Sequence, residues 1–470
     1  MSRWNNLSLM ALLLTGCMAG PNFKAPPDAS PLAYTAAPLP HLAADTDAPA
    51  TEEAAAWWLP LNSADLDATI RLALDHNRDL AAARATLGEM QELAAASEGA
   101  QYPNLNLQAS AGRQKYGAAF LGPEEFPTFS FYSVGFGVSY LFDFAGGVRR
   151  SVEQQYALSL YQQREVEAAA LSLSGNVALQ ALAAASARAQ IEMLEALLGD
   201  DATDLKLVRD AFEAGSANRV DVLNAQSQLA NDQTLLPPLR RSLSNAEHAL
   251  ALLVGRAPAD WNAPTFTLDE FTLPRQVPAT LPAELAHRRP DILAAEAQLH
   301  AATAAVGVAA ANLYPQVSLS ASASLQAVAL HSLFNGDSKA AGLTGSLTQP
   351  LFDHGTLRDK ERASREAMHA ALDTYEQVVL RSFSQVADAL EALEHDAELI
   401  DSEQSAVAVS SENLALTRES YTAGNTGVLQ VLDAQRQSQQ ARLGLVRAQA
   451  QRLTDLIELQ LALGGRMPAV

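Results

Sequence analysis

The residues that could carry out chemistry are few and scattered along the chain. No two histidines lie three to five residues apart, so the sequence holds no helical zinc pair. There is no GxxxxGK[ST] loop, and Gly135-Phe136-Gly137 lacks the third glycine of a dinucleotide-binding turn. The paired carboxylates Glu52-Glu53 and Glu124-Glu125 are typical of solvated loops. We therefore expect no catalytic residues, no metal site and no cofactor, and so no enzyme.

The composition narrows the class of protein further. The 470 residues include 53 acidic and 32 basic side chains, which gives a formal net charge of −21. This excess argues against nucleic acid as a partner, because phosphate contacts need clustered lysine and arginine. Beyond the first twenty residues, no uninterrupted apolar run reaches the roughly 18 residues of a membrane-spanning helix. The sequence therefore excludes a polytopic helical membrane protein.

The single cysteine, Cys17, ends a short apolar segment that is typical of a secretory signal, which we assign to residues 1–16. Leu14-Thr15-Gly16-Cys17 resembles the bacterial lipobox, in which the cysteine is acylated and becomes the first mature residue. A chance cysteine behind an ordinary signal is the alternative. Met18, in place of an aspartate, favours sorting to the outer membrane. Residues 17–60 are then a lipidated linker.

The chain contains a tandem duplication of about 210 residues, which is the strongest organisational signal in the sequence. Five short stretches recur in the same order at nearly constant spacing, and such agreement is not chance. The first copies are Asp79-Leu80-Ala81-Ala82-Ala83, Tyr102-Pro103, Leu141-Phe142-Asp143, Phe212 to Gln226 and Gly255 to Ala259; the second copies are Asp291 to Ala295, Tyr314-Pro315, Leu351-Phe352-Asp353, Tyr421 to Gln435 and Gly465 to Ala469.

Each repeat begins with an alanine-rich helical stretch, Asp75 to Gln101 and Arg289 to Leu313. Tyr-Pro ends each stretch, because proline cannot continue a helix. The apolar period then changes from 3.6 to 2 in two hairpins, 104–142 and 316–352. Strands of about ten residues, apolar on one side and small and polar on the other, are typical of transmembrane barrels. A soluble, half-buried hairpin is the alternative.

A very long helix follows each hairpin, from Gly147 to Glu213 and from Thr356 to Thr422. A straight helix of this length would span roughly 100 Å and needs partners along its length, so we predict coiled-coil packing. Return helices are predicted from Val220 to Val254 and from Leu429 to Leu463. Pro237-Pro238 predicts a kink in the first of them.

One chain supplies four strands, and an open four-stranded sheet cannot sit in lipid with unpaired edges. Two copies would make an eight-stranded barrel filled by side chains, whereas three copies would make twelve strands and leave a lumen. We therefore predict a mainly α fold with a transmembrane β-barrel. Tandem-duplicated long helical hairpins form a trimeric α-barrel, and each chain gives four strands to a 12-stranded β-barrel.

Three further stretches carry a family resemblance that covers the mature chain. They are Cys17 through Pro26, Trp57-Trp58 shortly before Leu66, and Asn77-Arg78-Asp79-Leu80. With the duplication, they make the sequence similar to the outer membrane efflux family of TolC-like channels, in particular to its OprM- and NodT-type lipoproteins. The resemblance implies a homotrimer with a long periplasmic helical barrel. It also implies two partners, a periplasmic adaptor and an inner-membrane transporter of the RND type.

The resemblance implies a passive exit duct for small molecules and drugs, lipid-anchored in the cell outer membrane and gated at its periplasmic tip. An outer membrane conduit for type I protein secretion is the close alternative. A periplasmic adaptor fits less well, because adaptors normally have one helical hairpin between lipoyl halves. The corresponding organisation is a first efflux repeat at 61–255, an equatorial segment at 256–282 and a second repeat at 283–470.

The family closes its periplasmic tip near the helix reversals, and four matched positions form the predicted gate. Tyr421 matches a tyrosine that pairs in the closed state, and Asp221 matches its carboxylate partner from the other repeat. Asp433 matches a pore-facing aspartate, whose three-fold ring would repel itself and attract cations. Gln430 stands where some members carry a second aspartate, and Thr426 where some carry a locking arginine. The implied lock is therefore weaker or differently wired, and plain helix-end packing and capping is the alternative to gating.

Two glycine turns reverse the long helices. Gly215 and Gly424 occupy the place of the usual left-handed helix cap. By resemblance to the family, these turns form the docking face for the adaptor.

Overall fold

A computed structural model gives the structure of most of the chain. The predicted signal 1–16, the predicted lipid-bearing residue Cys17 and the loop 116–126 lie outside the described residues. The described residues are 18–27, 34–35, 56–115, 127–271 and 289–465.

The chain divides into two compact units, and each unit draws on both predicted repeats. The first unit comprises Met1–Pro26, Thr86–Gln163 and Ala294–Glu376. The second comprises Pro27–Ala85, Arg164–Leu293 and Gln377–Val470. Because the compact units do not follow the repeat boundaries, the division of the sequence at 61–255, 256–282 and 283–470 stays a prediction.

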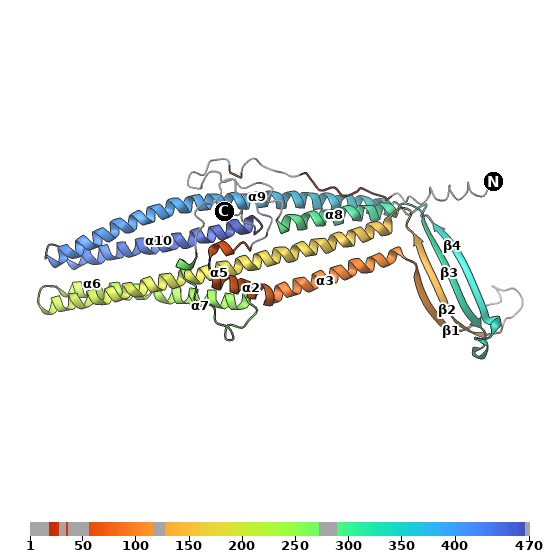
Figure 1. Ribbon diagram of the computed structural model, residues 1–470, viewed down its shortest axis with the longest axis horizontal. Coiled ribbons are helices and arrows are strands. Elements are labelled where there is room, and N and C mark those ends of the chain that lie inside the picture. Colours follow the sequence, from red (N-terminus) through yellow and green to blue (C-terminus); the bar gives the residue numbers. More distant parts are fainter. Residues whose placement is uncertain (1–17, 28–33, 36–55, 116–126, 272–288, 466–470) are drawn as a thin grey trace. The chain divides into compact units, whose positions relative to one another are not determined.

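The first unit contains a single four-stranded antiparallel sheet in the order β1-β2-β3-β4 (Figure 1). Its strands are β1 (Asn104–Gln114), β2 (Phe129–Phe142), β3 (Gln316–Ala327) and β4 (Lys339–Thr348). Both predicted hairpins are confirmed, and the pairing of β2 with β3 joins one repeat to the other. The second hairpin ends before its predicted limit at residue 352, because Pro350 has no N–H to continue the ladder.

The helices that precede the strands are α3 (Arg78–Glu98) and α8 (Pro290–Ala311). The first begins later than predicted, since Asn77 has an extended backbone that separates α3 from α2 (Ala64–His76). The Asn77 side chain caps α3 by accepting a hydrogen bond from the Leu80 N–H at 2.9 Å. Short 3₁₀ turns lie at Leu59–Leu61, Gly99–Gln101, Leu268–Glu270, Leu330–Ser332 and Gly336–Ser338.

The two long helices are confirmed with the predicted bounds, as α5 (Gly147–Glu213) and α9 (Thr356–Thr422). Gly175 and Gly199 lie within α5 and do not interrupt it. The return from α9 is one helix, α10 (Val428–Ala462).

The return from α5 is two helices, which corrects the predicted kink. α6 (Arg219–Gln233) ends before α7 (Leu236–Leu253) begins. Pro237 and Pro238 lie in the first turn of α7. Proline lacks the N–H that an interior helix position must donate, so the pair starts a new helix where a first turn tolerates it.

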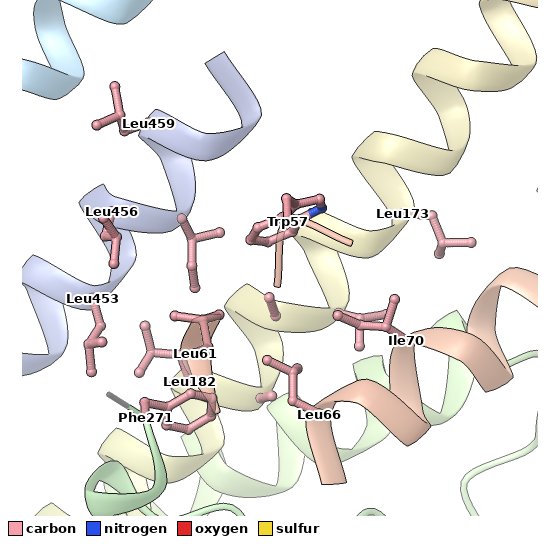
Figure 2. Packing of buried hydrophobic residues seen from close by; sticks show 14 of the residues in the cluster. Trp57, Leu61, Leu66, Ile70, Leu173, Leu182, Phe271, Leu453, Leu456 and Leu459 are labelled. Carbon is pink, nitrogen blue, oxygen red and sulfur yellow. The ribbon is translucent and has the colours of Figure 1, made fainter. Parts of the chain in front are cut away.

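The core of the second unit joins helices that are far apart in sequence. Figure 2 shows Leu66 and Ile70 of α2, Leu182 of α5 and Leu456 of α10 among the buried side chains. Each of these four side chains is at most 2% exposed. Apolar burial of this kind, about 25 cal/mol per Å², holds the long helices against their partners.

Two helices, α5 and α8, each contain an 18-residue stretch that is long and apolar enough to cross a membrane, by length and composition only. Polar residues interrupt both stretches, so a search for unbroken apolar runs did not predict them. Half of each stretch is buried inside the chain. Core helices meet the same criterion, so these stretches do not by themselves indicate a helical span.

We predict that Leu456→Ala lowers the free energy of unfolding by about 2–5 kcal/mol, because it leaves a cavity in the core. Leu252→Ala is the matched control, since Leu252 is 73% exposed. Denaturant unfolding followed by far-ultraviolet circular dichroism measures both variants. Equal effects of the two substitutions would show that the apolar core around Leu456 does not hold the helices together.

Candidate functional site

The two faces of the sheet differ in chemistry. The register places Leu107 opposite Phe136 and Phe136 opposite Ala323 on one face. On the other face, Gly137 lies opposite Ser322. Leu107 and Phe136 are 66% and 57% exposed, although they are large and apolar. An apolar outer face and a small, polar inner face suit a barrel wall between lipid and water.

Exposed aromatic side chains mark one end of the sheet. Tyr102 precedes β1, Phe144 follows β2, Tyr314 precedes β3 and Phe352 follows β4, which places all four at the same end of the antiparallel sheet. They are between 46% and 80% exposed. Aromatic rings at this level are typical of a membrane–water interface. We call these four residues the aromatic girdle.

The C-terminal ends of α5 and α9 are each followed by a turn, and the two turns are similar. Gly215 and Gly424 have φ angles of +76° and +77°, a region that L side chains rarely adopt. The Ser216 N–H donates to the Ala211 carbonyl at 2.9 Å, and the corresponding bond closes the second turn. This is the Schellman pattern. Among the described residues, no atom beyond the adjacent residues would lie within 4 Å of a Cβ at either glycine, so both turns are open.

A small apolar cluster joins the two helical hairpins near these turns. We call it the tip cluster, and Tyr421 of α9 and Leu229 of α6 pack against it. Its buried members are Leu205 and Val208 of α5, Val222 and Ala225 of α6, and Val428 and Leu432 of α10. The predicted gate residue Tyr421 therefore lies where the two hairpins meet.

Asp221 makes a capping box at the start of α6. Its Oδ2 accepts from the Asn218 N–H at 2.9 Å, and the Asp221 N–H donates to Asn218 Oδ1 at 3.0 Å. These hydrogen bonds are the helix-capping role that was the alternative to gating. Pairing of Asp221 with Tyr421 stays a prediction.

The other two predicted gate residues lie on the first turns of α10. Asp433 pairs with Arg436 and accepts from Gln437 Nε2 at 2.9 Å, and its side chain is 50% exposed. The Gln430 N–H donates to the Gly427 carbonyl at 3.2 Å. Asp433 therefore has a charge partner in its own helix, which the sequence did not reveal.

A buried acidic cluster, which the sequence did not indicate, links the same four helices that contribute to the tip cluster. Asp201 of α5 is 3% exposed, and its Oδ1 accepts from Gln435 Nε2 of α10 at 3.2 Å. Gln435 Oε1 in turn accepts from Arg418 of α9 at 3.2 Å. Asp204 of α5 and Asp232 of α6 complete the cluster.

These contacts perturb the protonation of the acidic cluster. Burial, with the neighbouring carboxyl of Asp232, raises the pKa of Asp201 to about 7. Asp201 Oδ2 has no hydrogen-bond partner among the described residues. Burial and Asp455 likewise raise the pKa of Asp396, in the second hairpin, to about 7. The part of the chain that the structure describes contains no group of three His, Cys, Asp or Glu that could hold a metal.

We predict that the helical region becomes more stable when the pH falls from 8 to 5. The pKa of Asp201 rises from 3.8 when unfolded to about 7 when folded, so its stabilising contribution is lost between those values as pH rises. Asp201→Asn should flatten this slope and stabilise the protein at pH 8 by on the order of 1 kcal/mol. Thermal melts followed by circular dichroism measure it, with Asp210→Asn, at an exposed position of α5, as the control. An unchanged slope in Asp201→Asn would contradict the prediction.

Comparison with known proteins fits this geometry. The sequence model of the outer membrane efflux protein family matches residues 69–256 and 281–465. The pyoverdine export outer membrane protein OpmQ of Pseudomonas aeruginosa is 31% identical over 417 residues, which is 87% of each chain. The toluene efflux pump outer membrane protein TtgI of Pseudomonas putida is 29% identical and covers 84% of this chain and 83% of its own.

Solved structures agree in fold. The outer-membrane channel OprN superposes with a TM-score of 0.89 at 27% identity and covers 96% of this chain and 99% of its own. The open state of the MtrE outer membrane channel of Neisseria gonorrhoeae gives a TM-score of 0.85 at 27% identity, covering 97% and 100%. The chain therefore belongs to the outer membrane efflux protein family, which confirms the predicted resemblance and the role of an outer membrane efflux channel.

Proposed function

We propose that three copies of this chain form a passive exit duct for small molecules through the outer membrane. One observation carries the proposal. A four-stranded sheet with an apolar, exposed face has β1 and β4 as its two edges, each paired on one side only within the described chain. In lipid the free backbone groups of both edges must be satisfied, so copies of the sheet must close into a barrel.

Three copies fit the closure best. Twelve strands leave room for a lumen, whereas eight strands would be filled by side chains. The lumen would be lined by the small, polar face of the sheet, with residues such as Gly137 and Ser322. A wide, polar lumen recognises little chemistry, so the choice of cargo belongs to a partner. The duct itself then carries out no catalytic step.

The cargo class is supported by the relatives. Their names include a pyoverdine exporter, a toluene efflux component and an antibiotic efflux component. These are small molecules, which favours efflux over protein secretion for this chain. Supply of cargo requires an inner-membrane transporter of the RND type and a periplasmic adaptor. The open, glycine-capped turns at Gly215 and Gly424 offer the adaptor an unobstructed surface.

The proposed gate lies at the tip cluster. Tyr421 packs where the two hairpins of one chain meet, so a change at its ring bears on their contact. Asp221 and Gln430 lie on the first turns of the two return helices, and Asp433 follows one turn after Gln430. In a trimer, three copies of Asp433 would surround the axis and attract cations. Acylation of Cys17 with several chains would anchor the duct stably.

The conductance of single channels in a planar bilayer tests the duct and its gate. We predict small, cation-preferring steps for the purified protein and larger steps for a Tyr421→Phe, Asp433→Ala variant, because the variant removes the hydroxyl proposed to pair with Asp221 and the carboxylate proposed to face the axis. Steps that the variant leaves unchanged would remove the gate assignment. A well-folded trimer without steps would overturn the duct.

Efflux in cells tests the docking turns. We predict that Gly424→Trp abolishes efflux while the trimer still assembles, because the bulky ring and the strained backbone spoil the turn. Gly336→Trp should leave efflux intact, because Gly336 is equally free of neighbours but lies in the loop between β3 and β4. Adaptor binding is measured in parallel by crosslinking. Unchanged binding to Gly424→Trp would count against docking at this turn.

A further inference from the structure

Arg150, four residues into α5, is a buried cation that the proposed duct does not use. It is 1% exposed and donates three hydrogen bonds. Nε donates to the Ala19 carbonyl at 3.2 Å, Nη1 to Glu153 Oε2 at 2.7 Å, and Nη2 to Asn22 Oδ1 at 2.6 Å. Two of the three acceptors belong to the segment 18–23, so Arg150 holds the chain just after Cys17.

The segment has further contacts that fix its course. The Ala19 N–H donates to the Ala145 carbonyl at 2.8 Å, in the turn between β2 and α5. The ring of Phe23 stacks on His300 of α8 with centroids 4.4 Å apart and planes 15° from parallel. His300 Nε2 lies 3.0 Å from Glu153 Oε1, so the ring that holds Phe23 is tied to α5.

Backbone packing makes the fit close. Gly20 has a φ of +80°, and a Cβ there would lie 2.6 Å from the Cα of Gly307 on α8. A Cβ on Gly307 would lie 2.7 Å from the side chain of Arg150. A side chain at either glycine would therefore displace the segment or the arginine. Three chain elements meet here without room for another methyl group.

The charges around Arg150 are matched. Burial alone would raise the pKa of Glu153, but hydrogen bonds from His300 and Arg150 hold that pKa below its usual range. The carboxylate therefore stays ionised between the two groups. Charge-assisted hydrogen bonds of this kind are stronger than neutral ones.

The contacts of the segment 18–23 lie next to the sheet and involve both repeats. α5 follows β2 in the first repeat and α8 precedes β3 in the second, so the segment lies against both repeats where β2 pairs with β3. Ala145 follows Phe144 of the aromatic girdle, which marks the level of the membrane surface. Cys17 lies outside the described residues but is covalently joined to Met18.

We propose that Arg150, Glu153 and His300 form a mount for residues 18–23, which fixes the lipid-bearing N-terminus beside the aromatic girdle across the boundary between the two repeats. The proposal rests on acylation of Cys17, which is part of the proposed function. A lipid on a mounted segment enters the membrane at one place on the sheet. A lipid on a flexible tether would set neither the depth nor the orientation of the sheet.

A spin label on Lys24→Cys tests the mount in the full-length protein, purified from membranes and reconstituted in lipid nanodiscs. Residue 24 is exposed and follows Phe23 directly. The sequence has one cysteine, so acylation of Cys17 leaves one free thiol in this variant. One label per chain reports acylation, and two labels per chain report its absence. Label mobility reports the mount independently of that count.

We expect an immobilised label in the Lys24→Cys protein and at least about a fivefold shorter correlation time when Arg150→Leu is added, because several hydrogen bonds are lost. Arg164→Leu is the matched control, since Arg164 also pairs with a glutamate three residues later on α5. Phe23→Ala removes the stacking from the segment alone and should also free the label, which keeps the test valid where Arg150→Leu does not fold. A mobile label without these changes, or an immobile one in Phe23→Ala and in any folded Arg150→Leu protein, overturns the mount.

Discussion

The unpaired backbone groups at the two edges of the sheet constrain the rest of the structure. β1 and β4 each pair on one side within the described chain, and lipid offers no hydrogen bonds to the other side. In the proposed duct, further copies of the chain would satisfy these groups, and the helices that adjoin each strand would be brought into a ring as well. The apolar outer face and the small, polar inner face of the sheet both suit such a closed barrel in lipid.

The repeated residues of the sequence are explained by where elements begin and end. Asp143 accepts from the backbone N–H groups of Val148 and Arg149 at the start of α5, and Asp353 accepts from those of Gly355 and Leu357 at the start of α9. Gly215, Gly255, Gly424 and Gly465 all have positive φ angles after a helix. The two copies therefore agree where local geometry tolerates few residue types, and they differ in helix interiors, where many side chains suffice.

This distinction also separates what the sequence predicted from what it did not. The long helices and the hairpins were predictable, because their period, proline and glycine signals are local. The break before Pro237 was predicted only as a kink, and the capping role of Asn77 was not predicted. The burial of Asp201 and Arg150 depends on which helices pack together, and no local pattern reports that. Charged residues on alanine-rich helices are usually solvated, so both positions resembled ordinary surface residues.

The contacts of the predicted gate residues within one chain bear on how a gate could work. The capping box of Asp221 uses one carboxylate oxygen, and the other oxygen still has lone pairs for a phenol such as that of Tyr421. Capping and gating are therefore compatible, and a gate built on Asp221 would be coupled to the start of α6. Asp433 is paired with Arg436, so a trimer would bring three ion pairs to the axis rather than three bare carboxylates. Exposed ion pairs are weak, so Arg436 lessens the cation preference of such a ring without abolishing it.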